Sequence, residues 1–171
     1  MEMKLSRCTL RPWRVGDEPS LERHANNRNV SRNLRDVFPY PYTSADARDW
    51  LALTVTRTPV QDFAIVVDGV AVGGISVTPN DGERRQSAEV GYWLGEPFWG
   101  RGIASEALRA ITEYAFSTFD VCRLEAGVYG WNPASARVLE KAGYTLEGRG
   151  RQAVLKDGQL TDRLLYGLVR P

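Results

Sequence analysis

The segment Tyr92–Ala115 constrains the fold most, because it joins a strand, a glycine-rich turn and a long amphipathic helix. The strand is predicted to end near Leu94 and the helix to begin near Gly102, after which apolar residues recur at helical spacing. Gly95, Gly100 and Gly102 have no Cβ, so another group can approach the turn closely. The helix start adds unpaired N–H groups and the positive end of the helix dipole. Together these features predict a cradle for a phosphate or pyrophosphate.

The same turn admits other interpretations. A plain strand-to-helix turn, in which glycine only relieves strain, stays open. The chain has no G-x-x-x-x-G-K-[ST] string, which excludes a P-loop. Gly100-x-Gly102-x-x-Ser105 nearly matches the G-x-G-x-x-G of dinucleotide-binding folds, and Glu125 follows in the next strand. However, Glu125 is predicted in the middle of that strand, and the chain before Gly100 lacks the alternating order of a doubly wound sheet.

Length and composition describe an ordinary globular chain. Its 171 residues, 43% of them apolar and 25% charged, predict one domain that spans residues 1–171 and has a substantial core. A formal net charge of +1 gives no reason to expect nucleic acid or an anionic membrane as a partner. Two cysteines and a single histidine predict neither a disulfide scaffold nor a metal site. No apolar run has the length of a membrane span or the character of a leader, so we expect a cytoplasmic protein.

The first part of the chain places helices around an early strand. Cys8–Trp13 is predicted as that strand, and Asp17 as the N-cap of a helix with a proline in its first turn. A second helical piece is expected over Asn29–Leu34. Asp36–Tyr42 contains prolines and three aromatics, and is expected to be either a lid over a pocket or a loop anchored in the core. A capping box at Thr43 then opens a helix. Its buried face is predicted to carry Trp50, Leu51 and Val55.

The remaining elements predict an α+β fold: a mixed, mostly antiparallel seven-stranded sheet flanked by helices. Asp68-Gly69 and Asp157-Gly158 are turn signals that predict two antiparallel hairpins. The cradle helix forms the parallel crossover, and Gly143 is predicted to end a short helix over Pro133–Ala142. The strands predicted after the first are Phe63–Val67, Val70–Thr78, Ser87–Leu94, Arg123–Tyr129, Tyr144–Leu155 and Leu160–Val169.

The cradle sequence resembles that of a known family. Trp99–Ala104, WGRGIA, is similar to the pyrophosphate-binding loop of the GNAT superfamily of N-acetyltransferases, written Q/R-x-x-G-x-G/A. The wider string YWLGEPFWGRGIASEAL resembles the branch of the ribosomal-protein N-terminal (alanine/serine) acetyltransferases and their small-molecule relatives. Trp99 stands where the superfamily has Gln or Arg, a departure that this branch commonly shows. Further family-like strings follow in the same order across nearly the whole chain.

The resemblance implies a GNAT-like fold and acetyl-CoA as co-substrate. In that fold the fourth and fifth strands, here Ser87–Leu94 and Arg123–Tyr129, splay apart and hold the pantetheine arm between them. Arg101 and Arg137 are candidate partners for the phosphates of the coenzyme, although surface arginines are commonly only solvated. The donors predicted for the cradle are the amides of Gly100, Arg101, Gly102, Ile103 and Ala104, with the Ser105 hydroxyl.

Acetyl transfer to an amine needs a base, because α-amines titrate near ~8 and lysines near ~10.4 and attack only when neutral. Glu89 is the candidate, since it lies on the strand that leads into the cradle, and Gly91 leaves the same strand face bare. A solvent-facing glutamate on the polar side of a strand is the competing interpretation. Tyr92, Trp93 and Leu94 end this strand and are predicted to contact the coenzyme. Amides near Tyr92 and Trp93 are also candidate donors to the tetrahedral oxygen.

Asn132 and Ser135 form the second candidate pair. Asn132 followed by proline is first of all a good helix N-cap. The same geometry places Asn132 and Ser135 about one turn apart on one helix face. The string also matches the N-x-x-S of the resembled branch, which implies that Asn132 binds the pantetheine arm and that Ser135 is the acid for the leaving thiolate. Many GNAT enzymes use a tyrosine seven residues after the asparagine, but this chain has Leu139 there.

The sequence therefore predicts an N-acetyltransferase that moves an acetyl group from acetyl-CoA directly to a primary amine. No cysteine or triad stands near the motifs to form an acyl-enzyme. The branch resemblance favours a protein N-terminal α-amine as acceptor, while amino acids, polyamines and aminoglycosides stay open. A coenzyme A-binding module without catalysis and an NAD-type oxidoreductase are the alternatives from other classes. A monomer and a homodimer are both compatible with the sequence.

Overall fold

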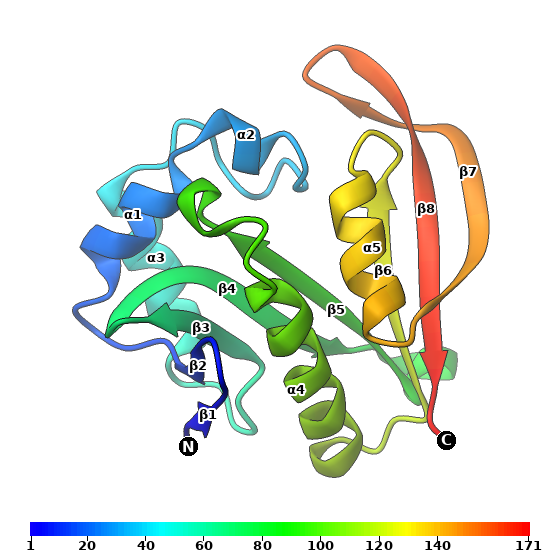
Figure 1. The fold of residues 1–171 in the computed structure, drawn as a ribbon, viewed down its shortest axis with the longest axis horizontal. Coiled ribbons are helices and arrows are strands. Elements are labelled where there is room, and N and C mark those ends of the chain that lie inside the picture. Colours follow the sequence, from blue (N-terminus) through cyan, green and yellow to red (C-terminus); the bar gives the residue numbers. More distant parts are fainter.

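The computed structural model describes all of residues 1–171, which form one eight-stranded sheet with five α-helices (Figure 1). The strand order is β1-β2-β3-β4-β5-β6-β8-β7, and only β5 and β6 are parallel neighbours. None of the helices combines the length and the apolar character that crossing a membrane would need. The strands are β1 (Met3–Lys4), β2 (Thr9–Pro12), β3 (Asp62–Val67), β4 (Val70–Pro79), β5 (Ser87–Leu94), β6 (Arg123–Tyr129), β7 (Thr145–Lys156) and β8 (Gln159–Val169). The helices are α1 (Glu18–Ala25), α2 (Arg28–Ser31), α3 (Ser44–Thr54), α4 (Ile103–Thr118) and α5 (Pro133–Lys141), with 3₁₀ turns η1 (Gly82–Arg84) and η2 (Glu96–Phe98).

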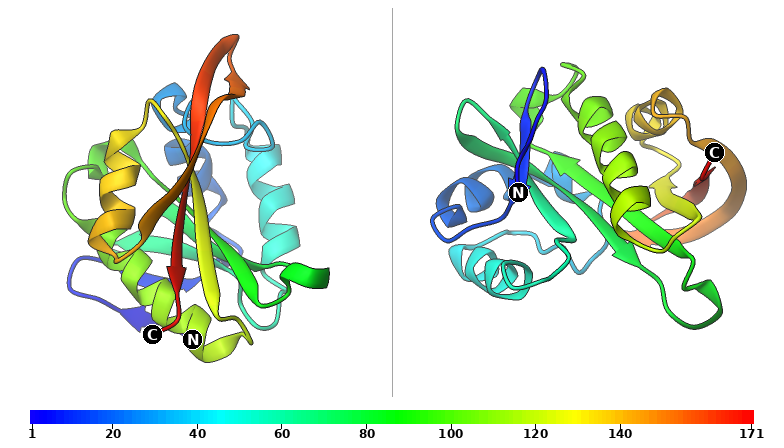
Figure 2. Two further views of the ribbon diagram at one scale, coloured as in Figure 1. Left: turned by 90° about the vertical axis from the view of Figure 1, so that its right-hand side faces the viewer. Right: turned by 90° about the horizontal axis from the view of Figure 1, so that it is seen from below.

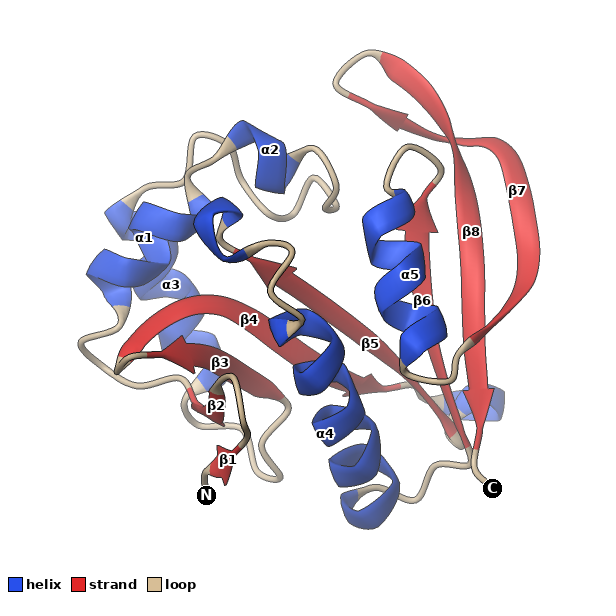
Figure 3. Cartoon of the chain, viewed as in Figure 1, coloured by secondary structure: helices blue, strands red, loops and turns tan.

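Helices cover both faces of the sheet, as Figures 2 and 3 show: α4 and α5 lie on one face, and α1 and α3 on the other. Each face has its own apolar core. In β3, Phe63 and Ile65 enter the core under α4, whereas Ala64 and Val66 enter the core under α1 and α3. This alternation is what a strand buried on both faces requires. As a result, α4 and α5 lie next to each other on the same face of the sheet.

The structure confirms the α+β class and the order of the elements, with one strand more than predicted. The eighth strand, β1, has two residues and pairs with β2. A strand this short has no periodicity to detect in the sequence. Both predicted hairpin turns are present: Asp68 and Gly69 have φ of +49° and +80°, and Asp157 and Gly158 have φ of +51° and +76°. The mostly antiparallel sheet contradicts a doubly wound dinucleotide-binding fold.

The predicted N-cap of α1 is confirmed in position only, and one predicted contact of α3 is wrong. Asp17 is the N-cap residue of α1 but makes no capping hydrogen bond, because its carboxylate accepts from Arg11 at 2.7 and 2.8 Å in a buried ion pair. Val55 follows α3 as its C-cap and is 41% exposed. Thr43 does form the predicted capping box, because its hydroxyl accepts from the Asp46 amide at 3.3 Å and its amide donates to the Asp46 carboxylate at 2.7 Å. The local sequence pattern therefore predicted where these helices lie, but not the contacts of Asp17 and Val55.

The segment 36–42 is irregular, as predicted, and aromatic packing anchors it. The Phe38 ring lies 5.2 Å from the ring of Tyr42 and 5.5 Å from that of Trp93 on β5. Tyr42 is buried, and this burial raises its pKa to about 12. The contacts favour the core-anchored loop over the lid. They also place this segment beside β5.

Candidate active site

β5 and β6 separate to form the central cavity of the molecule. Parallel pairing joins only three residue pairs, the last of them Glu89 with Glu125, and beyond this point the two strands diverge (Figure 1). Main-chain groups of β5 beyond Glu89 therefore have no strand partner on the β6 side. A cavity of about 590 Å³ occupies the fork, lined by β5, β6, α4 and α5. Pockets for small ligands commonly measure about 300–1,000 Å³.

The glycine-rich turn lines this cavity. Gly100 and Gly102 have φ of +74° and +75°, a region that glycine adopts without strain. The indole Nε1 of Trp99 donates to the Leu94 carbonyl at 2.7 Å and so ties the turn to the end of β5. α4 then begins at Ile103 without a side-chain cap, which leaves its first amides open to a ligand. This geometry fits the anion cradle that the sequence predicts.

The residues predicted for the site all line this one cavity, although they come from β5, the turn, α4 and α5. Packing of α5 beside α4 brings the Asn132 motif to the cradle, some thirty residues away in the chain. The structure places all of the predicted site residues on the cavity wall. Their chemical roles stay predictions. In chain order they are Glu89, Tyr92, Trp93, Leu94, Gly100, Arg101, Gly102, Ile103, Ala104, Ser105, Asn132, Ser135 and Arg137.

Three basic side chains from α5 and the turn also line the cavity. Arg101 lies over the Phe98 ring, with its Cζ 5.2 Å from the ring centroid. Arg137 and Lys141 lie four residues apart and therefore on one face of α5. Lys141 was not predicted, although this spacing from Arg137 could have indicated it. Exposed cations around a bare helix N-terminus suit a ligand that carries several phosphates.

Two hydroxyl groups meet where β5 faces α5. Tyr92 Oη lies 2.8 Å from Ser135 Oγ and donates to the Ser135 carbonyl oxygen at 3.1 Å. Burial raises the pKa of Tyr92 far above its usual range, against a smaller opposite effect of the hydrogen bond with Ser135. The phenol is therefore protonated at neutral pH and can act as a donor. The sequence predicted Tyr92 as a coenzyme contact and its main chain as an oxyanion donor, but not its contact with Ser135. Leu139, at the usual tyrosine position, is fully buried.

Asn132 caps α5 as predicted, because its Oδ1 accepts from the Ser135 amide at 3.3 Å. We expect Asn132→Ala to lower the free energy of unfolding by about 1 kcal/mol, the usual effect of a lost cap. It should also weaken binding of acetyl-CoA, the co-substrate that the sequence resemblance implies, because the residue lines the cavity. Chemical denaturation and titration calorimetry measure the two effects. Thr43→Ala, which removes the cap of α3, is the matched control: it should lower stability and leave coenzyme affinity unchanged. Wild-type affinity in Asn132→Ala would exclude a binding role.

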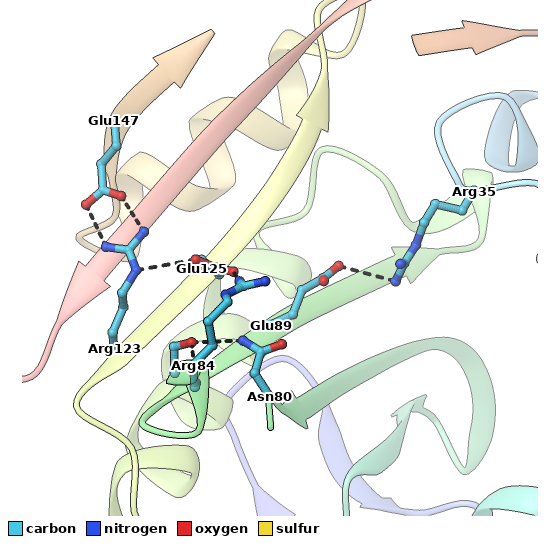
Figure 4. Close-up of polar contacts among 8 residues, drawn as sticks. Arg35, Asn80, Arg84, Glu89, Arg123, Glu125 and Glu147 are labelled. Carbon is cyan, nitrogen blue, oxygen red and sulfur yellow. Dashed lines mark hydrogen bonds and ion pairs between the residues drawn. The ribbon is translucent and has the colours of Figure 1, made fainter. Parts of the chain in front are cut away.

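Glu89 and Glu125 are neighbours at the fork, but their partners differ (Figure 4). Glu125 is bound by Arg84 and by the Nε of Arg123 at 3.3 Å, and its side chain is 14% exposed. Glu89 has one partner, Arg35, whose Nη2 lies 3.2 Å away and whose side chain is 74% exposed. Ion pairs this exposed are worth about 0–1 kcal/mol, so a ligand can replace them. Glu89 is therefore the carboxylate of the fork that lines the cavity and can exchange its partner for a ligand.

Several cavity residues have no signal in the sequence. Asn33 and Arg35 follow α2, and Arg163 lies on β8. They reach the cavity only because α2 and the β7–β8 hairpin pack around the fork, which no local pattern predicts. No group of three or more His, Cys, Asp and Glu side chains is arranged to hold a metal ion.

Comparison with known proteins agrees with this fold and site. The family of the acetyltransferase (GNAT) domain matches residues 7–145. Because this match spans most of the sequence, the chain belongs to the GNAT family of N-acetyltransferases. A solved structure of RimL, a ribosomal L7/L12 alpha-N-protein acetyltransferase in complex with coenzyme A, has a TM-score of 0.87 and covers 99% of this chain and 98% of that one. At 23% identity this likeness shows the fold alone.

Relatives at higher identity match part of the chain. YjcK of Bacillus subtilis is 41% identical over 86 residues, which are 50% of this chain and 48% of that protein. The [ribosomal protein uS5]-alanine N-acetyltransferase of Escherichia coli is 33% identical over 82 residues, 48% of this chain and 42% of that protein. The chain thus spans less than half of these two relatives. The Escherichia coli L-amino acid N-acetyltransferase AaaT is 26% identical over 157 residues, 86% of this chain and 96% of that protein.

Proposed function

We propose that this chain transfers the acetyl group of acetyl-CoA to the α-amine of a protein N-terminus. The observation that carries the proposal is the forked cavity, which holds together a bare helix N-terminus, the Glu89 carboxylate and the Tyr92–Ser135 hydroxyl pair. Acetyl-CoA supplies the activated acyl group when bound. The amides from Gly100 to Ala104 would hold its pyrophosphate, and Asn132 its pantetheine arm.

Glu89 takes the role of base in this proposal. An α-amine is largely protonated at neutral pH, so its proton must leave before it attacks. Glu89 accepts that proton, directly or through a water molecule, at the point where β5 and β6 part. The amides near Tyr92 and Trp93 donate to the developing oxyanion, since β5 has no strand partner on this side.

The Tyr92–Ser135 pair is proposed to stabilise the departing sulfur. A thiol titrates near ~8.5, so the thiolate is a fair leaving group and needs limited help. A serine hydroxyl by itself is a poor proton source. The protonated Tyr92 lies 2.8 Å from it and can donate to it when its one proton turns from the Ser135 carbonyl oxygen, 3.1 Å away, to Oγ. Transfer is proposed to be direct, because neither Cys8 nor Cys122 lines the cavity.

Ser135→Ala is expected to lower kcat by about 10²-fold, within the usual range for general acid catalysis. Tyr92→Phe should have an effect of similar size, and the double variant should be no slower than either, because the two hydroxyls act as one unit. Thiol release at saturating acetyl-CoA measures all three rates. Tyr144→Phe is the matched control, since this buried hydroxyl bonds Thr112 at 2.9 Å outside the cavity. Full activity of Ser135→Ala, or additive losses in the double variant, would contradict the relay.

A free amino acid is the second candidate acceptor. It is favoured by the match to AaaT, an L-amino acid N-acetyltransferase that aligns with 86% of this chain. The protein amine is favoured by the match to the uS5-alanine N-acetyltransferase and by the cradle sequence. The cytoplasmic location stays a prediction, and a monomer and a homodimer both stay open.

A panel of acceptors tests the proposal. Thiol release from acetyl-CoA should be fastest with peptides that begin with Ser or Ala, and slower with free amino acids and polyamines. Mass spectrometry should find the acetyl group on the α-amine. Acetyl-CoA binding without thiol release for any amine would instead favour a coenzyme-binding module.

A further inference from the structure

Charged side chains gather around Tyr129, which ends β6 and pairs in register with Arg163 on β8. We call Arg35, Asp36, Tyr129, Lys156 and Arg163 the Tyr129 cluster. Three of its members, Arg35, Tyr129 and Arg163, line the cavity. Burial raises the pKa of Tyr129, and the charges of all four other members act on the same hydroxyl. Residues from the loop after α2, from β7 and from β8 therefore meet beside the fork.

The charges of the cluster do not balance. The Nζ of Lys156, a side chain only 7% exposed, donates to Asp36 at 2.8 Å. Arg35 is paired with Glu89 at 3.2 Å. Arg163 takes part in none of the ion pairs of the chain. The cluster thus keeps one positive charge without a carboxylate partner on a side chain that lines the cavity.

Gly127 places Arg163 on the same side of the sheet as Glu89. A Cβ added at Gly127 would lie 2.9 Å from Nη2 of Arg163, so the guanidinium rests on bare backbone. Gly127 and Glu125 share one face of β6, and Glu125 pairs in register with Glu89. Two residues along a strand span roughly 7 Å. Glu89 and Arg163 both line the one cavity, Glu89 from β5 and the Arg163 guanidinium from above Gly127 of β6.

From this geometry we infer that the Tyr129 cluster binds a carboxylate of the acceptor, with Arg163 as the principal donor. The inference rests on the proposed function, because it requires that Glu89 receives the amine. Arginine suits this ligand, since its planar fork can donate two parallel hydrogen bonds to a carboxylate. Two acceptors carry a carboxylate close to their amine: a peptide with an acidic second residue, and a free amino acid.

Steady-state kinetics with matched acceptors tests the inference. The peptides are Ser-Glu-Ala-Ala, Ser-Gln-Ala-Ala and Ser-Lys-Ala-Ala, all amidated, together with alanine and alaninamide. The wild type should prefer the acidic peptide to the other two, or alanine to alaninamide, by about 10- to 150-fold in kcat/KM, the range for hydrogen bonds to a charged group. Arg163→Gln should abolish that preference and leave the Gln peptide or alaninamide nearly unchanged. Arg151→Gln, which removes an exposed charge from β7 outside the cavity, should keep it.

The outcomes separate this inference from the proposed function. Acetylation of all peptides at equal rates, with alanine no better than alaninamide, would overturn the carboxylate site and leave the protein acceptor intact. Acetylation of alanine alone, lost in Arg163→Gln, would support the site and overturn the protein acceptor. An equal loss for every acceptor in Arg163→Gln would show a purely structural role and overturn the site. If none of these amines is acetylated, both proposals are overturned.

Discussion

Glu89→Gln is expected to lower kcat by about 10²–10⁴-fold at neutral pH, because the amide keeps the shape of the side chain and removes its basic lone pair. The deficit should shrink as pH rises past about 8, where a growing share of the acceptor α-amine is already neutral. Thiol release across a pH series measures the effect. Affinity for acetyl-CoA should barely change, because the cradle lies on other residues of the cavity wall.

Glu125→Gln is the matched control for that experiment. It removes the carboxylate paired in register with Glu89, but this one is already bound by Arg84 and Arg123 (Figure 4). Its removal should leave the shape of the pH profile unchanged. A loss in Glu89→Gln that is equal at all pH values would show that Glu89 positions the acceptor and does not take its proton.

Gly102→Val is expected to weaken acetyl-CoA binding by more than about 10²-fold. A Cβ at Gly102 would lie 3.0 Å from Arg7 Nε, so a branched side chain would crowd the start of α4. Losing two charge-assisted hydrogen bonds there costs about 3–6 kcal/mol. The dipole of the helix alone contributes only about 0.3–1 kcal/mol. Titration calorimetry with coenzyme A measures the change directly.

Backbone strain must be separated from this effect, because Gly102 has φ of +75°, where valine is strained. Gly158 has φ of +76° at the tip of the β7–β8 hairpin, and a Cβ there meets nothing within 4 Å. Gly158→Val therefore introduces the same strain away from the coenzyme and should keep normal affinity. Equal affinity in the two folded variants would show that the cradle is misplaced.

The coenzyme side of the site could be predicted from the sequence because its signals are local. Gly100 and Gly102 indicate the turn because they have no side chains. Apolar residues at helical spacing over about four turns predict α4. Asn132 followed by proline marks the start of α5 in the same way. Each of these signals lies within a few residues of the feature that it predicts.

The acceptor side could not be predicted because it depends on contacts between distant elements. The Tyr92 side chain reaches Ser135 only through the packing of α5 on the sheet, 43 residues on. Arg35 approaches the fork from the loop after α2, and Arg163 from β8. Nothing in their sequence neighbours distinguishes them from surface arginines. The contact of Asp17 could not be predicted for the same reason: its carboxylate forms a buried ion pair with Arg11 and does not cap α1.

Product analysis of a single peptide tests the central claim most directly. The peptide begins with serine, contains one internal lysine and is incubated with acetyl-CoA and either the wild type or Glu89→Gln. The proposed function predicts one acetyl group on the serine α-amine, equimolar release of free coenzyme A thiol, and much slower formation of both by the variant. Thiol release without an acetylated amine, an acetyl group on lysine alone, or no reaction with this peptide would contradict it.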